Sequence, residues 1–232
     1  MKLKDLLQKM RAALGSFTRD GEAVADWEPF KTRRRVEIMV TGDPSRVGAV
    51  ADAMDEAQKQ LFAGNGDAIE LRITGFLDNC IHRSRWSKKP FKAAAQARRW
   101  QCEQAKTRFA DAFADSRGEM LDDLVIIGDR FDDRMEDALR QVEHLKEQGV
   151  RVHCFHTGKD LSSQEAYEKL ATESGGVFMR LEGQSSIAEV MPILMAHLND
   201  RDKVPAVEAG GNEAQKLKRL LTQDDEENPE LP

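Results

Sequence analysis

The stretch VEIMVTGDPSRVGAV, residues 36–50, decides the fold class. Val36–Val40 is an apolar run with the length of a buried strand, and residues 44–62 place apolar side chains at helical spacing. The polar segment between them, residues 41–45, therefore lies where a strand ends and a helix begins. Such a segment either holds a ligand at the carboxyl end of the strand or is an ordinary turn in which Asp43 caps the helix. Both interpretations remain open from the residues alone.

The alternation of strand and helix continues to about residue 199. Further strands are predicted at 69–73, 124–127, 150–155 and 177–181, and further helices at 107–116, 133–148, 162–173 and 185–198. A capping box at residues 162–165 is expected to open one of these helices, whereas the segment 76–100 has no regular pattern. Short apolar strands joined by helices are typical of a mostly parallel sheet with helices on both faces. The sequence therefore predicts a doubly wound α/β fold, in a single domain over residues 34–200.

Both ends of the chain differ from this domain. Residues 1–33 begin with leucines at helical spacing and continue into an irregular basic segment, which predicts an amphipathic helix and a connector. Residues 203–232 are polar and acidic, so we expect a disordered tail with at most a short helix near 213–221.

Composition narrows the classes of function. The 232 residues are 40% hydrophobic and 33% charged, with a formal net charge of -6, which argues against a general nucleic-acid binder. The three cysteines are far apart and form no CxxC pair, so neither a disulfide framework nor a zinc ribbon is expected, and reduced thiols fit a cytoplasmic protein. The first residues do not resemble a secretory signal, and no run of about 18 apolar residues predicts a membrane span.

The usual motifs of nucleotide-binding and hydrolytic enzymes are missing from the sequence. No GxGxxG follows a predicted strand, and neither GxxxxGK[ST] nor GxSxG occurs. Side chains that carry oxygen remain at predicted strand ends and at one helix start: Thr41, Asp43, Ser45, Thr107 and Asp129. Hydroxyls and carboxylates suit magnesium, manganese or calcium, so a divalent-cation site is one interpretation. Local helix capping and hydroxyl contacts are the other.

Three segments resemble the von Willebrand factor A (VWA) family. They are TRFADAF (107–113), DDLVIIGDRFDDRMEDALRQVEHLKEQGVRVHCFHTGKD (122–160) and AYEKLATESGGVFMRL (166–181). The resemblance implies a non-enzymatic protein-interaction module with a metal-ion-dependent adhesion site that holds Mg²⁺ or Mn²⁺. The family's first ligand loop, D-x-[ST]-x-S, reads Thr41-Gly-Asp43-Pro-Ser45 here, so one position departs from the pattern in either register. Thr107 and Asp129 take the positions of the second and third ligand loops.

The same resemblance implies a protein partner that presents an acidic side chain, and in bacteria such domains often accompany AAA+ ATPases. Arg46 and Arg130 lie in the ligand loops, where they are candidate partner-binding residues and would also repel a cation. A hydrolase that uses Asp43, Asp129 and His82 for acid–base work is an alternative function, although nothing in the spacing selects a substrate.

A basic insert occupies about residues 78–106, and its charges extend over 82–108. Arginines and lysines alternate there with aromatic residues, and Trp86, Arg98 and Arg99 are its candidate partner-binding residues. Three interpretations remain open. The insert docks an acidic protein surface, or it binds nucleic acid, or its charges are solvated or paired with the acidic tail of the same chain.

Overall fold

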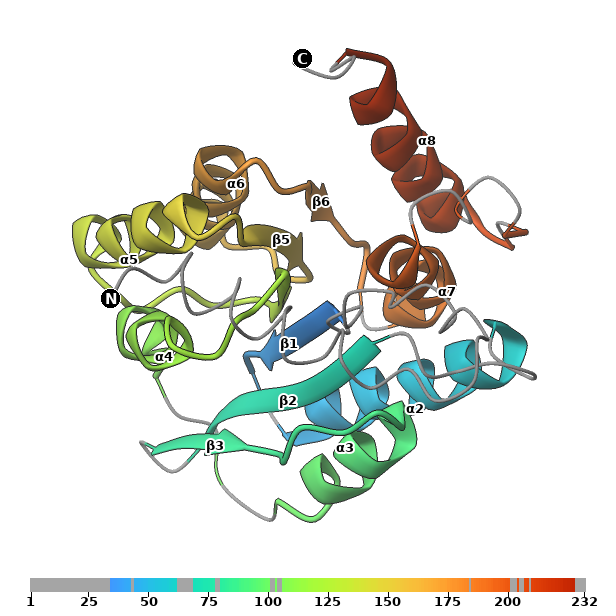
Figure 1. The fold of residues 1–232 in the computed structure, drawn as a ribbon, viewed down its shortest axis with the longest axis horizontal. Coiled ribbons are helices and arrows are strands. Elements are labelled where there is room, and N and C mark those ends of the chain that lie inside the picture. Colours follow the sequence, from blue (N-terminus) through green and yellow to red (C-terminus); the bar gives the residue numbers. More distant parts are fainter. Residues whose placement is uncertain are drawn as a thin grey trace, which may run out of the picture. The chain divides into compact units, whose positions relative to one another are not determined.

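Six strands of the described residues form one sheet, in the spatial order β3-β2-β1-β4-β5-β6 (Figure 1). The computed structural model describes residues 34–42, 44–61, 69–77, 80–100, 103, 106–183, 185–200, 204, 207–208 and 210–227. The strands are β1 (Arg34–Val40), β2 (Ile69–Leu77), β3 (Cys80–Arg83), β4 (Asp123–Gly128), β5 (Arg151–His156) and β6 (Phe178–Arg180). Only β2 and β3 pair in the antiparallel sense; the other neighbours are parallel, which confirms the mostly parallel sheet.

Helices cover both faces of the sheet (Figure 1). They are α2 (Pro44–Leu61), α3 (Pro90–Ala97), α4 (Phe109–Ser116), α5 (Met135–Glu147), α6 (Leu161–Ser174), α7 (Ser185–Asn199) and α8 (Asn212–Glu227). Apolar side chains of α2, α3 and α7 form one core with one face of the sheet, and those of α4, α5 and α6 form a second core with the other face. The predicted doubly wound fold class is therefore confirmed.

The pleat of β1 sends side chains into both cores. Val36, Ile38 and Val40 belong to the core with α2 and α7, whereas Met39 belongs to the core with α4 and α5. Successive side chains of a strand point to opposite faces, so Glu37 points to the same face as Met39. A carboxylate buried on that face requires partners, because burying a charge without hydrogen bonds is costly.

Glu37 finds these partners on the neighbouring strand and on α4. Its carboxylate accepts hydrogen bonds from Arg72 Nη2 at 2.7 Å, Thr74 Oγ1 at 2.6 Å and Ser116 Oγ at 2.7 Å, and Arg83 Nε lies 3.5 Å away. Apolar and polar residues alternate over 69–74 in the sequence, which is typical of a half-buried strand, but Arg72 and Thr74 are buried as well. That expectation is corrected, since the polar side chains of β2 face a buried carboxylate rather than solvent.

The segment without a sequence pattern contains two regular elements. β3 continues the sheet as an antiparallel edge strand, and α3 packs its alanine face against α2 and β2. α3 begins at Pro90, whose fixed φ suits the first turn of a helix. These elements are short, so their sequences carry little periodicity.

The helix α6 begins earlier than predicted. Asp160 is its N-cap, because the Asp160 carboxylate accepts from the N–H of Ser163 at 2.9 Å and from the hydroxyl of Ser162 at 2.8 Å. The expected capping box at residues 162–165 is therefore replaced by an aspartate cap two residues upstream. The helix ends at Ser174, one residue later than predicted, and Gly175 after it has φ +71° and adopts the left-handed conformation common at helix C-termini.

A helix also occupies most of the predicted tail. The 16 residues of α8 pack on α7, and Ala214, Leu217 and Leu221 are buried in the core that contains α7. The short helix predicted near 213–221 lies within this longer helix, and the expectation of disorder is corrected for the rest of residues 212–227. The predictions for residues 1–33 lie outside the described residues. None of the described helices has the length and apolar character needed to cross a bilayer.

Candidate functional site

The candidate site lies where β1, β4 and β5 end side by side. Hydrogen bonds between backbones continue past the strands, since Thr41 N–H donates to the carbonyl of Ile127 at 3.0 Å and Thr157 N–H donates to that of Gly128 at 2.7 Å. Ligands of doubly wound α/β proteins bind beyond these strand ends. We call the described residues at these strand ends the carboxyl edge: residues 41–42, 44–46, 128–134 and 157–160.

Arg46 and Asp129 form the central ion pair of the carboxyl edge. Arg46 lies in the first turn of α2, and Asp129 directly follows β4. The guanidinium donates from Nη1 to Asp129 Oδ1 at 2.7 Å and from Nη2 to Oδ2 at 2.8 Å, and Nη1 also donates to the carbonyl of Thr41 at 2.6 Å. The side chain of Arg46 is 7% exposed and that of Asp129 is 29% exposed. A two-point bond of this kind fixes the orientation of both side chains.

Two glycines permit these close approaches. A Cβ atom on Gly42, which has φ +107°, would lie 1.8 Å from Nη1 of Arg46. A Cβ atom on Gly128 would lie 1.7 Å from Oγ1 of Thr41. The backbone of the carboxyl edge is therefore packed so tightly around Thr41 and Arg46 that larger residues would displace them.

Tyr167 belongs to the site, although the sequence did not indicate it. Its buried hydroxyl donates to the carbonyl of Arg130 at 3.2 Å and lies 3.0 Å from Oγ1 of Thr41, so it ties two loops to α6. Burial raises the pKa of Tyr167, which keeps the side chain a neutral phenol. In the sequence Tyr167 occupies an apolar-face position of a predicted helix, and no local signal marks it as a polar contact.

The buried side chain of His156 lies beside Tyr167. Its ring meets that of Tyr167 edge to face, with 5.5 Å between the centroids. Burial lowers the pKa of His156, so its imidazole is neutral at pH 7.

Thr107 is bonded to the loop that follows Asp129. Its hydroxyl donates to Asp133 Oδ2 at 3.0 Å and accepts from the N–H of Asp132 at 2.7 Å. The Asp133 carboxylate also accepts from the N–H groups of Phe109 and Ala110, so it caps α4 from a different part of the chain. These contacts join Thr107 to residues 25 and 26 positions away, so they differ from the local hydroxyl contact that was one of its two interpretations.

The remaining predicted residues of the carboxyl edge differ in exposure. Ser45 is exposed in the first turn of α2, and Asp43 lies outside the described residues. The Arg130 side chain is 43% exposed, and its guanidinium lies 3.4 Å from Asp132 Oδ1.

The donors described here do not fit a divalent cation as they lie. Both oxygens of Asp129 are bound by Arg46, while the hydroxyls of Thr41 and Thr107 are engaged with other side chains. No three His, Cys, Asp or Glu side chains among the described residues are grouped to hold a metal. A divalent ion about 4 Å from the guanidinium would also be repelled by about 8 kcal/mol at an effective dielectric constant of about 20.

Two predicted partner-binding residues of the basic insert are bound within the chain. The guanidinium of Arg98 pairs with Asp52 and Asp55 of α2, at 2.5 and 2.8 Å. The indole of Trp86 donates to Glu119 Oε2 at 3.0 Å and lies 4.6 Å below the guanidinium carbon of Arg72. The charges of the insert are therefore partly neutralised by the folded domain, and Arg99 stays exposed on its surface.

Two of the residues suggested for hydrolysis, His82 and Asp129, are separated in the sheet. His82 lies on β3, an edge strand, whereas Asp129 follows β4, three strands away. At the usual spacing of neighbouring strands this corresponds to about 14 Å. Direct proton exchange between these two side chains is excluded by that distance.

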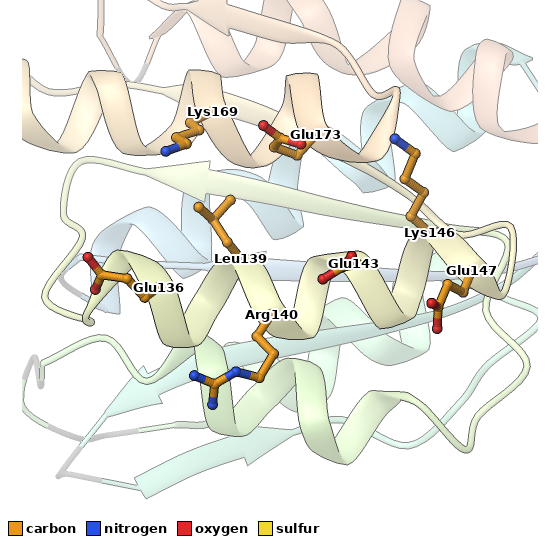
Figure 2. Close-up of a pocket in the computed structure, with 8 residues that line it drawn as sticks. All are labelled: Glu136, Leu139, Arg140, Glu143, Lys146, Glu147, Lys169 and Glu173. Atoms are coloured by element: carbon orange, nitrogen blue, oxygen red, sulfur yellow. The ribbon is translucent and has the colours of Figure 1, made fainter.

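A groove of about 850 Å³ lies between α5 and α6 (Figure 2). Its walls consist of four glutamates, two lysines, one arginine and Leu139, and Figure 2 shows the leucine between the two helices. Pockets for small molecules are mostly apolar, with a few convergent polar groups. The residues that line this groove are charged except for Leu139, and none of the carboxyl-edge residues described above is among them.

Comparison with known proteins gives matches of structure only. Neither a scan of protein-family models nor a search of curated proteins found a match. The SpRpn10 VWA domain is 10% identical, with a TM-score of 0.51 over 68% of this chain and 94% of that one. The N-terminal domain of TFIIH p34 is 9% identical, with a TM-score of 0.50 over 70% and 97%.

A pilus adhesin from Lactobacillus rhamnosus GG, SpaC, is 8% identical, with a TM-score of 0.56 over 72% of this chain. The chain spans only 30% of that adhesin's length. At these identities the likeness concerns the fold alone.

Proposed function

We propose that this chain, which has a VWA-like fold, is a non-enzymatic protein-interaction module that binds its partner through the carboxyl edge. The observation that carries the proposal is the rigid support of the loop 129–134. Protein partners are proposed because this loop presents fixed polar groups to solvent.

Contacts from α2, from α6 and from the segment before α4 hold that loop. Arg46 of α2 binds Asp129, Tyr167 of α6 binds the carbonyl of Arg130, and Ser163 accepts the N–H of Phe131 at 3.1 Å. The segment before α4 binds the last part of the loop through Thr107, as described above. A loop fixed in this way loses little conformational freedom on binding, which is the general advantage of preorganisation. Loops on a rigid scaffold are also the usual carriers of recognition.

The exposed arginines of the loop favour an acidic partner. The side chains of Arg130 and Arg134 are 43% and 81% exposed, respectively. Arginine is enriched among the residues that dominate binding energy at protein interfaces. The partner class implied by the VWA resemblance, an AAA+ ATPase, is the first to test.

The free thiols Cys80 and Cys154 support a reducing compartment such as the cytoplasm.

The experiment compares partner capture by three versions of the full chain. The loop variant is Arg130→Ser with Arg134→Ser, and the matched control is Arg117→Ser with Arg219→Ser, which removes two exposed arginines elsewhere. Captured proteins are cross-linked and quantified by mass spectrometry. The loop variant is expected to lose at least about tenfold of the captured partner, if each arginine contributes about 1 kcal/mol. Equal capture by all three versions would refute a role for this loop.

A further inference from the structure

We propose that the Arg46 guanidinium takes the place of a divalent cation at the carboxyl edge, so that the site is assembled without metal. The VWA resemblance implies a metal-ion-dependent adhesion site, and the described donors do not fit one. This inference concerns the internal organisation of the site. It does not depend on whether the carboxyl edge binds a partner.

The guanidinium makes the contacts that a hard cation would make. It donates hydrogen bonds of 2.6 to 2.8 Å to three oxygen atoms. These are the Thr41 carbonyl after β1 and both carboxylate oxygens of Asp129 after β4. Carbonyl and carboxylate oxygens are the ligands that Mg²⁺ and Ca²⁺ take in proteins. A positive charge built into α2 thus joins the two strand ends.

The space around the guanidinium is shaped for it. Gly42 lacks the Cβ atom that would occupy the position of Nη1, and its φ of +107° is one that residues with side chains rarely adopt. The Arg46 side chain is almost fully buried. An added ion would have to displace the guanidinium rather than bind beside it.

Electrostatics requires the pairing with Asp129. Arg46 lies in the first turn of α2, where the helix macrodipole disfavours a positive charge, and that turn contains no acidic residue. The Asp129 carboxylate, which follows β4, supplies the compensating negative charge. The pair is therefore coupled, because removing either partner leaves a charge without its partner in a largely buried position.

The experiment measures Mn²⁺ binding by electron paramagnetic resonance, through the loss of the free-ion signal. The proteins are the wild type, Arg46→Ala, Asp129→Asn and the double variant. Arg98→Gln is the matched control, because it breaks another arginine–aspartate contact to α2. Thermal unfolding is recorded for each protein in EDTA and in millimolar MgCl₂ or MnCl₂.

The wild type and Arg98→Gln are expected to bind no Mn²⁺ at millimolar concentration and to unfold at the same temperature in EDTA and in metal. Arg46→Ala is expected to bind Mn²⁺ at least tenfold more tightly than the wild type, because Asp129 and the Thr41 carbonyl become available. The double variant should lose this gain. Saturable Mn²⁺ binding by the wild type that Asp129→Asn abolishes would overturn the proposal, as would an Arg46→Ala protein that folds and binds no better than the wild type.

If Arg46→Ala fails to fold, the wild type and Asp129→Asn still test the proposal. Asp129→Asn should then lower the unfolding temperature equally with and without metal. A wild-type unfolding temperature that rises with metal, and an Asp129→Asn protein that has lost this rise, would show that a cation is the native ligand. Partner capture in EDTA is a separate measurement, so the proposed function and this inference fail independently.

Discussion

At the scale of single residues, the carboxyl edge depends on two glycines, because a Cβ atom at Gly42 or Gly128 would overlap Arg46 or Thr41. Gly128 ends β4 at the point where the side chain of Thr41 crosses it. Sequence patterns do not show this requirement, because a glycine after an apolar strand is common in any turn. The constraint comes from a strand that lies far away in the sequence.

Gly128→Ala should destabilise the protein by roughly 2 kcal/mol or more, because the new methyl group would lie 1.7 Å from Oγ1 of Thr41. The change is measured as the free energy of unfolding in urea. Gly118→Ala is the control, since a Cβ atom there meets nothing within 4 Å, and it should change stability by less than about 0.5 kcal/mol. Similar values for both variants would contradict the tight packing at Gly128.

At the scale of elements, α8 extends the core beyond the predicted domain. Its leucines at positions 217 and 221 are buried beside α7, whereas Leu220 is 38% exposed. The acidic composition of residues 203–232 suggested disorder, but a helix needs only one apolar face to pack. Propensity and composition are weak guides when tertiary contacts stabilise a segment.

Leu217→Ala should lower the free energy of unfolding by about 2–4 kcal/mol, because it removes a fully buried side chain and leaves a cavity. Leu220→Ala, on the exposed face of the same helix, should cost less than about 1 kcal/mol. Both are compared with the wild type by urea denaturation. If α8 were detached from α7 in solution, the two substitutions would have equally small effects.

The elements themselves were largely predictable, while the site was predictable only in outline. Strand and helix periodicity is local, so the order of elements from β1 to α7 follows from the sequence, apart from β3 and α3. The burial of Arg72 was missed because its partner Glu37 is 35 positions away. The Arg46–Asp129 pair joins residues 83 positions apart, so the sequence showed only that each lies in a loop region after a predicted strand.

At the scale of the whole molecule, the amino ends of the strands bury charges whose balance depends on pH. Asp123 is fully buried at the start of β4 and is bound by Arg34, Arg151 and His153. His153 accepts the N–H of Val177 at Nδ1, so its Nε2 carries the hydrogen that points to Asp123. Despite the cost of burial, the hydrogen bond from His153 and the nearby arginines hold the pKa of Asp123 well below its usual range.

His197 makes the protein sensitive to acid. Burial, together with the neighbouring His153, lowers the pKa of His197 from 6.5 to about 3. Between pH 6.5 and about pH 3, His197 is protonated in the unfolded chain but not in the folded chain. The contribution of His197 to the free energy of unfolding is therefore fully present above pH 6.5 and is lost as the pH falls. The loss should be on the order of 3 kcal/mol by about pH 4.

His197→Leu should flatten this dependence, as measured by urea unfolding at several pH values between 4 and 7. His144→Gln, at a half-exposed position on α5, is the control and should retain the wild-type slope. A slope unchanged by His197→Leu would assign the acid sensitivity to other groups. Below about pH 4, protonation of Asp123 adds a second loss of stability in both variants.

The central position of β1 has a consequence for the order in which the chain folds. β1 is the first of the described strands in the sequence, yet one of its two neighbours is β4, and the Arg34–Asp123 contact joins residues 89 positions apart. At about 5–20 residues per second, a ribosome needs roughly 4–18 s to synthesise that interval. Until β4 is made, at least one side of the strand 34–40 is unpaired. The newly made protein is therefore expected to be vulnerable to misassociation until β4 emerges and completes the centre of the sheet.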